Sequence, residues 1–416
     1  MVIFPKIIYI RAHLCYNATM FGLIDEETER RDRLSAFYRS EYGKGPVRWF
    51  SSPGRAEIVG NHTDHNLGKV IVSAISCDIL CACEKREDDI VEISAEAFNP
   101  IRFSVHDLAS REREKGKSVG LARGVLNYIR KLGYSFGGFR ASTHSTVFRG
   151  AGVSSSAAFE VLIAEIVNCL YLGGRLSPLE KAMAGQYAEN FYFGKPSGLL
   201  DQAGIAFGGF NLIDFGGVNA PAVNRIPSPK GYKIVMTNTG SAHAGLIPLY
   251  TDIKREMSEV AAFFEKKYLR ELTIEDLQEN LHRLRRKVTD RAILRAYHFF
   301  EENERVQRAA EALSRGDTAT FLRQVQNSGE SSLGFLQNCY VPQDTYQPVV
   351  VAMKMSEHLI KDGAYRMMGG GFTGTVLAFC KEGTERDYGK VMARVFGREN
   401  VHYTDLRGTG ACEIER

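Results

Sequence analysis

Gly150 to Ser156 is the segment whose residue types best suit phosphate chemistry, because it contains two glycines and three serines. A strand is expected just before it, over Phe139 to Val147, and the apolar stretch after it, Phe159 to Leu172, indicates a buried helix. A helix N-terminus attracts anions, and glycine keeps the backbone N–H groups accessible. A serine-rich helix cap is the ordinary structural explanation, but three serines exceed what one cap requires. The segment therefore predicts a phosphate-binding loop.

The segment from Pro53 to Gly68 concentrates polar side chains in a short turn between two expected strands. It contains arginine, histidine, asparagine and aspartate, which together offer forked donors and acceptors suited to a ligand with many hydroxyl groups. His62 and His65 could instead ligate a metal ion. No cysteine or acidic triad accompanies them, so we favour a sugar ligand over a metal.

Two carboxylates, Glu189 and Asp201, lie twelve residues apart around a second glycine-rich turn. A carboxylate near a phosphate loop can hold Mg²⁺, and another can orient or deprotonate a hydroxyl nucleophile. Taken alone, either residue could be an ordinary surface carboxylate. Their position beside the expected phosphate loop favours the chemical interpretation.

The standard nucleotide-binding motifs do not fit this chain. The form GxxxxGK[ST] would need a glycine before Gly116, but Arg111 occupies that position. Gly369, Gly371 and Gly374 fit GxGxxG, yet a dinucleotide fingerprint precedes a helix and the residues after Gly374 indicate a strand. An NAD-dependent oxidoreductase is therefore not favoured.

Helical segments are indicated in two further regions. Charged and apolar residues alternate at helical spacing from Val105 to Leu132. No glycine occurs from Leu246 to Arg315, and no proline from Leu249 to Val341, so this long stretch must be mainly helical. Thr273, with an aspartate three residues on, suggests one of its helix starts.

A domain boundary is expected between Pro221 and Lys230, where three of the twelve prolines fall. We therefore divide the chain into an N-terminal domain over 1–220, which contains the turn and loop described above, and a C-terminal domain over 221–416. The second domain contains the glycine loop at Gly369 to Gly374, directly before its expected strand.

The composition is that of an ordinary globular protein. Of its 416 residues, 44% are hydrophobic and 25% charged, which excludes disorder and collagen-like repeats. The net charge of +4 is small and dispersed, so nucleic acid binding is not suggested. Eight scattered cysteines indicate buried thiols; Cys81 and Cys83 would lie on one face of a strand. No stretch approaches the roughly 20 apolar residues of a membrane span, so we expect a cytoplasmic protein without membrane partners.

Together these segments resemble the GHMP kinase superfamily, and most closely its galactokinase branch. The turn with Pro53, Gly54, Arg55 and His62 to Asp64 is similar to the galactokinase signature, and Gly150 to Ala157 is similar to the phosphate-binding motif of the superfamily. Arg366 to Gly374 resembles the third, glycine-rich motif, and Gly198 to Gln202 resembles the segment that holds the catalytic aspartate.

The resemblance implies an α+β fold in two lobes, with an N-terminal domain of the ribosomal protein S5 domain 2-like type and the active site between the lobes. It also implies an ATP- and Mg²⁺-dependent kinase acting on the anomeric hydroxyl of a sugar, and we expect a monomer. Asp201 and Arg55 would be catalytic, and Ser156 and Glu189 would hold Mg²⁺. The sugar would be bound by Asn61, His62, Thr63, Asp64 and Tyr250. The ATP phosphates would be bound by Gly150, Ala151, Gly152, Val153, Ser154, Ser155 and Ser156.

Departures from the family pattern concern the sugar more than the reaction. Asn61 stands where galactokinases carry a glutamate, and His65 where they usually have a tyrosine. Asn61 would tolerate a C6 carboxylate that a glutamate would repel, so galacturonate is an alternative substrate to galactose. Thr251 and Ile253 replace the usual asparagine and arginine after the expected sugar-binding tyrosine, and Phe148 replaces a proline before the phosphate loop.

Two other classes of function remain. Some relatives of galactokinase are non-catalytic sensors that bind ATP and sugar, and loss of Arg55 or Asp201 would favour that class, but both residues are present. Mevalonate and homoserine kinases lack the His-Thr-Asp sugar motif and fit less well.

Overall fold

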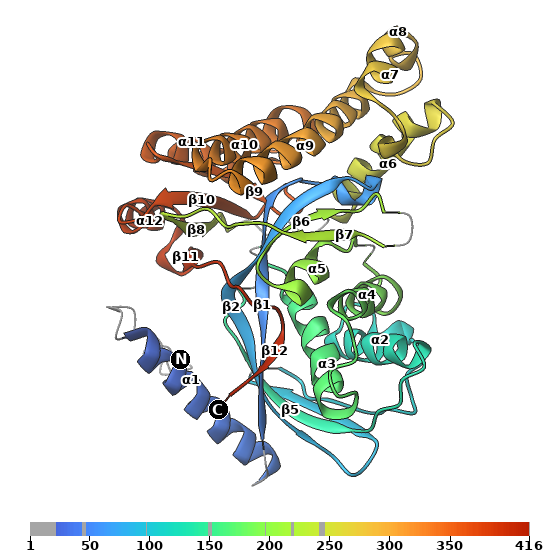
Figure 1. The fold of residues 1–416 in the computed structure, drawn as a ribbon, viewed down its shortest axis with the longest axis vertical. Coiled ribbons are helices and arrows are strands. Elements are labelled where there is room, and N and C mark those ends of the chain that lie inside the picture. The colour runs from blue at the N-terminus through green and yellow to red at the C-terminus, as the bar shows by residue number, and fades with distance from the viewer. Residues whose placement is uncertain are drawn as a thin grey trace, which may run out of the picture.

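Two β-sheets organise the chain in the computed structural model, which describes residues 22–43, 47–96, 98–148, 152–195, 197–217, 220–240 and 246–415. Among these residues the first sheet has eight strands and the second has four (Figure 1). The first sheet contains β1 (Arg48–Val59), β2 (Lys69–Lys85), β3 (Ile90–Ala95), β4 (Ile101–Ser104), β5 (Phe139–Ser145), β6 (Phe210–Asp214), β7 (Ala222–Arg225) and β12 (Cys412–Ile414). The second contains β8 (Tyr232–Asn238), β9 (Gly363–Met368), β10 (Thr375–Lys381) and β11 (Val401–Thr404).

The strands of the first sheet run β12-β1-β2-β5-β3-β4. Strand β6 pairs with the first residues of β2, on the same edge as β5, and β7 lies beside β6. The pairing of β3 with β5 is parallel, and the other pairings are antiparallel. The second sheet is antiparallel in the order β11-β8-β10-β9. Helices and sheets of this kind confirm the expected α+β class.

Helices cover both faces of the first sheet. On one face, α3 (Ser155–Tyr171) and α5 (Leu200–Phe207) pack against the strands, and α2 (Ser118–Lys131) and α4 (Pro178–Ala188) pack mainly against these helices. Helix α1 (Gly22–Tyr42) crosses the other face (Figure 1). Side chains alternate between these faces along β2. Leu80 and Ala82 contact the α1 side, and Cys81 and Cys83 are fully buried on the other. The two cysteines therefore share one strand face, as predicted.

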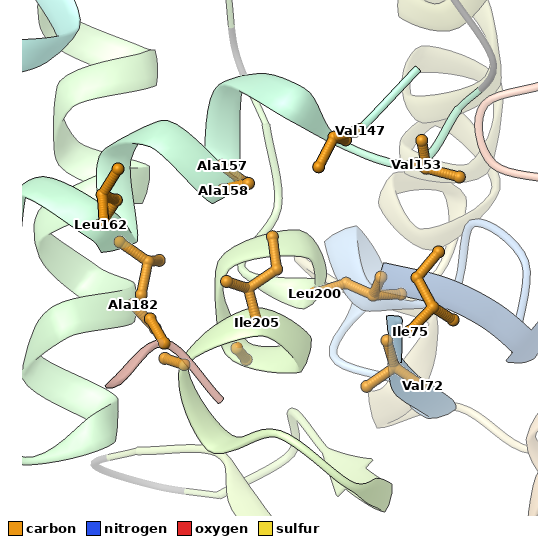
Figure 2. Packing of buried hydrophobic residues seen from close by; sticks show 14 of the residues in the cluster. Val72, Ile75, Val147, Val153, Ala157, Ala158, Leu162, Ala182, Leu200 and Ile205 are labelled. Carbon is orange, nitrogen blue, oxygen red and sulfur yellow. The ribbon is translucent and has the colours of Figure 1, made fainter. Parts of the chain in front are cut away.

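Figure 2 shows the packing of this helical layer, where Val72 and Ile75 of β2 lie near Leu200 and Ile205 of α5. Helix α3 is buried on most of its circumference because it packs between the sheet and neighbouring helices, which is why its sequence is apolar on most faces. The predicted strand and buried helix around the glycine-serine run are thus observed as β5 and α3, with small shifts at their ends.

The part of the chain that forms the second sheet and the helices after β8 is called the second lobe here, and the predicted long helical stretch lies in it. It forms α6 (Ile247–Phe263), α7 (Ile274–Glu279), α8 (Leu281–Leu284) and α9 (Asp290–Ser314), and further helices follow as α10 (Thr318–Ser331), α11 (Pro348–Leu359) and α12 (Glu385–Phe396). Thr273 begins α7, as predicted: its hydroxyl accepts from the Asp276 N–H at 3.2 Å, and the Asp276 carboxylate accepts in return.

The two lobes share hydrophobic core. Phe321 of α10 lies edge-on to Phe210 of β6 in the first sheet, with ring centroids 6.0 Å apart, and 5.7 Å from Phe379 of β10 in the second. The division proposed at residue 220 stays a prediction, but two strands beyond it, β7 and β12, pair in the first sheet. In the part of the chain described, no helix is long and apolar enough to span a bilayer.

The helical spacing from Val105 to Leu132 correctly predicted a helix, α2, in this region, but the predicted start was too early. Helix α2 begins at Ser118, and the preceding residues form a loop with a short 3₁₀ turn, Glu112–Glu114. Gly116 adopts a φ of 70° just before the helix. The charges of this loop serve tertiary contacts, since Glu114 pairs with buried Arg123 at 2.8 Å.

Candidate active site

Asp201 and Arg55 form the centre of the candidate site. Arg55 lies on β1 and Asp201 is the second residue of α5, where the two side chains form an ion pair with Nη2 to Oδ1 at 2.6 Å and Nε to Oδ1 at 2.8 Å. The Ser154 hydroxyl donates to Oδ2 of Asp201. Burial alone would raise the pKa of Asp201, but the charges of Arg55 and Lys195 hold it below its ordinary value. Asp201 is therefore an ionised carboxylate with an oriented cation beside it.

The glycine-serine run lies against this pair. Gly150 and Ala151 are outside the described residues. Gly152 has a φ of 67° and its carbonyl accepts from Arg55, while the Val153 side chain is buried in the core and its carbonyl accepts from the Arg55 N–H at 3.3 Å. Thus only the backbone of Val153 is available to a ligand. Ser154 precedes α3 with a φ of 61°, and Ser155 and Ser156 are its first two residues.

Glu189 and Ser156 form a second pair at the N-terminus of α3. The Ser156 hydroxyl donates to Oε1 of Glu189 at 3.1 Å, and Lys195 Nζ lies 2.8 Å from the same oxygen. Gln202 donates to Oε2 at 3.0 Å, and it also donates at 3.0 Å to Glu160, which is fully buried behind it. Burial, followed by the charge of Glu189, raises the pKa of Glu160 well above its ordinary value.

These residues fit a magnesium site of the type completed by nucleotide phosphates. Mg²⁺ is commonly held by one or two carboxylates together with phosphate oxygens and water. Among the described residues no group of three or more histidine, cysteine, aspartate or glutamate side chains is placed to hold a metal ion by itself. A hydroxyl and a carboxylate in contact, as in Ser156 and Glu189, provide the partial ligand set that such a site needs.

His62 and Asp64 lie in the turn that joins β1 and β2, next to the ion pair of Asp201 and Arg55. His62 has a φ of 56° and its Nε2 donates to the Gly370 carbonyl at 2.9 Å; burial lowers its pKa to about 4, so its ring is neutral. Burial, with the charges of Asp201 and Glu57, raises the pKa of Asp64 to about 6. A Cβ at Gly198 would overlap the Asp64 carboxylate, so only glycine permits this approach.

Thr63 is turned into the protein. It is fully buried, and its hydroxyl contacts the carbonyls of Gly60 at 3.0 Å and Lys69 at 2.7 Å, which closes the turn. Its side chain therefore shapes the turn and offers no free group to a sugar.

Asn61 is also fully buried, and its side-chain amide is used internally. Its nitrogen donates at 2.8 Å both to Glu57 and to the Gly369 carbonyl, and its oxygen accepts from Asn338 at 2.8 Å. Its backbone carbonyl accepts from His298 at 2.9 Å. A sugar could reach Asn61 only if one of these hydrogen bonds broke, so the structure gives no support to the direct contact predicted from the sequence.

Tyr250 lies on α6 over the third glycine motif. Its hydroxyl donates to the Gly371 carbonyl at 3.2 Å, its ring covers the Cα of Gly370, and it contacts Phe372 edge-on with centroids 5.6 Å apart. The same motif approaches the phosphate loop, since a Cβ on Gly369 would lie 3.6 Å from the Gly152 carbonyl. Residues far apart in sequence thus converge at one place, from β1, α3, α5, α6 and the turn after β9.

Three contacts beside the site were not predicted from the sequence, although Arg366 belongs to the third glycine-rich motif. Lys195 contacts Glu189, and its position in the second glycine-rich turn was a signal that could have singled it out. Arg366 of β9 is fully buried and donates to Glu57 at 3.0 Å. Glu302 of α9 accepts from the Gly60 N–H at 2.8 Å, and nothing in its helical sequence distinguishes it from neighbouring glutamates. Tertiary contacts of this kind become visible only when the lobes are assembled.

Comparisons with known proteins agree with this geometry. Residues 36–85 match the galactokinase galactose-binding signature, and residues 120–209 match the GHMP kinases N terminal domain. The galactokinase of Lactococcus lactis, solved in complex with galactose, superposes with a TM-score of 0.79 over 92% of this chain and 100% of its own, at 23% identity. Mevalonate kinase from Methanococcus jannaschii gives a TM-score of 0.62 over 87% of this chain and 99% of its own, at 14% identity. A putative sugar kinase from Campylobacter jejuni gives 0.59 over 88% and 98%, at 18% identity.

The chain thus has the two-domain fold of the GHMP kinases and carries their N-terminal domain. Residues 36–85, which include the turn between β1 and β2, match the galactokinase galactose-binding signature, so the similarity extends to the galactokinase branch of that class. Both parts of the resemblance found in the sequence are confirmed.

Proposed function

We propose that this protein is an ATP-dependent kinase that phosphorylates the anomeric hydroxyl of galactose or a closely related sugar. The observation that supports this most is the ionised Asp201, which is held by Arg55 and Ser154 between the phosphate loop and the galactose-binding turn.

Asp201 would accept a hydrogen bond from the anomeric hydroxyl and orient its oxygen toward the phosphoryl group. Its lowered pKa makes it a weak base, so orientation is its main role and the proton leaves late in the reaction. Phosphoryl transfer passes through a loose transition state and needs little activation of the nucleophile. Arg55 would stabilise the negative charge that develops on the sugar oxygen.

The ATP phosphates would bind the backbone of residues 150–156 at the start of α3, and Ser156 and Glu189 would hold Mg²⁺. The bound ion would supply neutralisation of the phosphate oxygens during transfer. His62 and Asp64 would contact sugar hydroxyls, while Asn61 and Thr63 fix the turn that presents them. Tyr250 would border the sugar from the second lobe.

An ADP-release assay across galactose, N-acetylgalactosamine, L-arabinose and galacturonate tests the proposal. We expect turnover with galactose or one of its close derivatives. The side chain of Asn61 is occupied by internal hydrogen bonds, which weakens the argument that it accommodates a C6 carboxylate. We therefore expect galactose as the first substrate and galacturonate as the alternative. If a sugar binds but none of the four sugars causes ADP release, the result would contradict the kinase proposal and favour a non-catalytic sensor.

Gly198→Ala should impair sugar binding selectively. The new methyl group would displace the Asp64 carboxylate, so we expect the sugar KM to rise about tenfold or more while nucleotide affinity changes little. Gly334→Ala is the matched control, because a Cβ at that position meets no atom within 4 Å. Steady-state kinetics and calorimetric titration with nucleotide measure both effects. An unchanged sugar KM would show that Asp64 is not a sugar ligand.

A further inference from the structure

Lys195 is a cation in the candidate site whose position is fixed by its neighbour Glu189. The Lys195 N–H donates to the Glu189 carbonyl at 3.1 Å, and its Nζ lies 2.8 Å from the Glu189 carboxylate. Gly194, with a φ of 86°, makes the tight turn that returns the chain toward Glu189. Backbone and side chain of Lys195 are therefore both held beside the residue proposed to bind Mg²⁺.

The Lys195 side chain interacts with both carboxylates of the site. It forms the ion pair with Glu189, and its charge helps to lower the pKa of Asp201. At the same time the side chain is 55% exposed, whereas Glu189 is 1% exposed. The ammonium group is thus half-exposed at the mouth of the site, in an ion pair that phosphate oxygens could replace, and it is not part of a closed buried pair.

The phosphate loop itself has no such cation, because residues 150–156 contain neither lysine nor arginine. In P-loop proteins a lysine supplies the mobile positive charge at the terminal phosphates. The transferred group must lie between the residue that orients the sugar, Asp201, and the residue that holds Mg²⁺, Glu189. A cation that interacts with both Asp201 and Glu189 would therefore lie near the terminal phosphate of the nucleotide and not near its base.

We propose that Lys195 binds the γ-phosphoryl group of ATP and stabilises its charge during transfer, an inference that rests on the proposed kinase function. Without nucleotide, Lys195 neutralises Glu189; once that carboxylate serves Mg²⁺, the ammonium turns to phosphate oxygens. In the reaction, the bond between the γ-phosphorus and the ADP oxygen breaks and a bond to the sugar oxygen forms. The hydroxyl proton leaves to Asp201 or to water, and Lys195 makes and breaks no covalent bond.

Lys195→Met tests this assignment through nucleotide affinity as well as rate. We expect the Kd of a non-hydrolysable ATP analogue with Mg²⁺ to rise about tenfold, as for loss of one charged hydrogen bond, and the Kd of ADP to rise less than about twofold. The kcat should fall about a hundredfold, with partial recovery in Lys195→Arg. Calorimetry and steady-state kinetics measure these values, and thermal melting should show little change in stability.

Lys115→Met is the matched control. Lys115 lies next to Gly194, is 48% exposed and pairs with Glu112 at 2.8 Å. Its substitution therefore removes a similar charge close to Lys195. It should change neither Kd nor kcat. Equal losses of ATP-analogue and ADP affinity in Lys195→Met, or no loss of either, would overturn the assignment while leaving the kinase proposal intact. Absence of turnover by the wild-type protein with every sugar would instead count against the kinase function, since the binding measurements need no turnover.

Discussion

Replacing Asp201 by asparagine should lower kcat by about three orders of magnitude while folding and ATP binding stay nearly unchanged. The amide keeps the shape of the side chain but carries no charge. It therefore cannot act as the ionised acceptor that orients the sugar hydroxyl, and Arg55 loses the partner that fixes its guanidinium at 2.6 Å. Steady-state ADP release, calorimetric titration with nucleotide and thermal melting measure the three properties.

Asp214→Asn provides the control for this substitution. Asp214 also pairs with an arginine, Arg270, at 3.0 Å, and its side chain is 25% exposed compared with 26% for Asp201. It lies on β6, away from the phosphate loop, so kcat should not change. Turnover of the Asp201 variant near the wild-type level would rule out the role assigned to that carboxylate.

Arg366→Met should cost about 3–5 kcal/mol of unfolding free energy, because it leaves the buried Glu57 carboxylate without its cation. Arg366 also donates to the carbonyls of Ile58 and Met367, at 3.0 Å and 2.8 Å, which would lose these bonds. Urea denaturation measures the loss. Arg285→Met, which breaks an exposed ion pair with Asp290, should cost less than about 1 kcal/mol.

The loss should depend on pH in a defined direction. Burial already raises the pKa of Glu57, and removal of Arg366 raises it further. A carboxyl group whose pKa is raised in the folded state favours folding at low pH and loses that contribution as the pH rises through its folded pKa. The difference in unfolding free energy between variant and wild type should therefore become smaller as the pH falls. Adding Glu57→Gln should recover part of the stability, and a constant gap at every pH would exclude the unpaired carboxylate as its cause.

Much of the fold could be predicted where one local pattern dominates. The absence of glycine and proline marks the helices from α6 to α9, and the apolar stretch after the serines marks α3 because a helix buried on most faces needs apolar residues on most faces. The loop before α2 was mistaken for helix because its charges follow helical spacing, although Glu114 uses its charge to pair with Arg123. Such a pairing depends on tertiary distance, which spacing does not encode.

In the site, residue types predicted which segments meet in the fold. They did not predict which side chains in those segments are already occupied by internal hydrogen bonds. The Asp201–Arg55 ion pair joins two segments that the motifs had already singled out. Asn61 shows the limit, since one residue in a polar turn can bind a ligand or support the turn, and its hydrogen bonds to Glu57 and Asn338 arise from contacts across the fold. Only the assembled structure decides between these two roles.

The pairing of β12 with β1 has a consequence for the order in which this protein acquires its structure. Glu413 meets Arg48 at the edge of the first sheet, and the two residues are separated by 365 positions in the chain. During synthesis, the sheet that carries Arg55 must wait for its outermost strand until nearly all of the second lobe has left the ribosome. Contacts of such long sequence separation slow folding, so the nascent N-terminal lobe exposes an open strand edge for most of its synthesis.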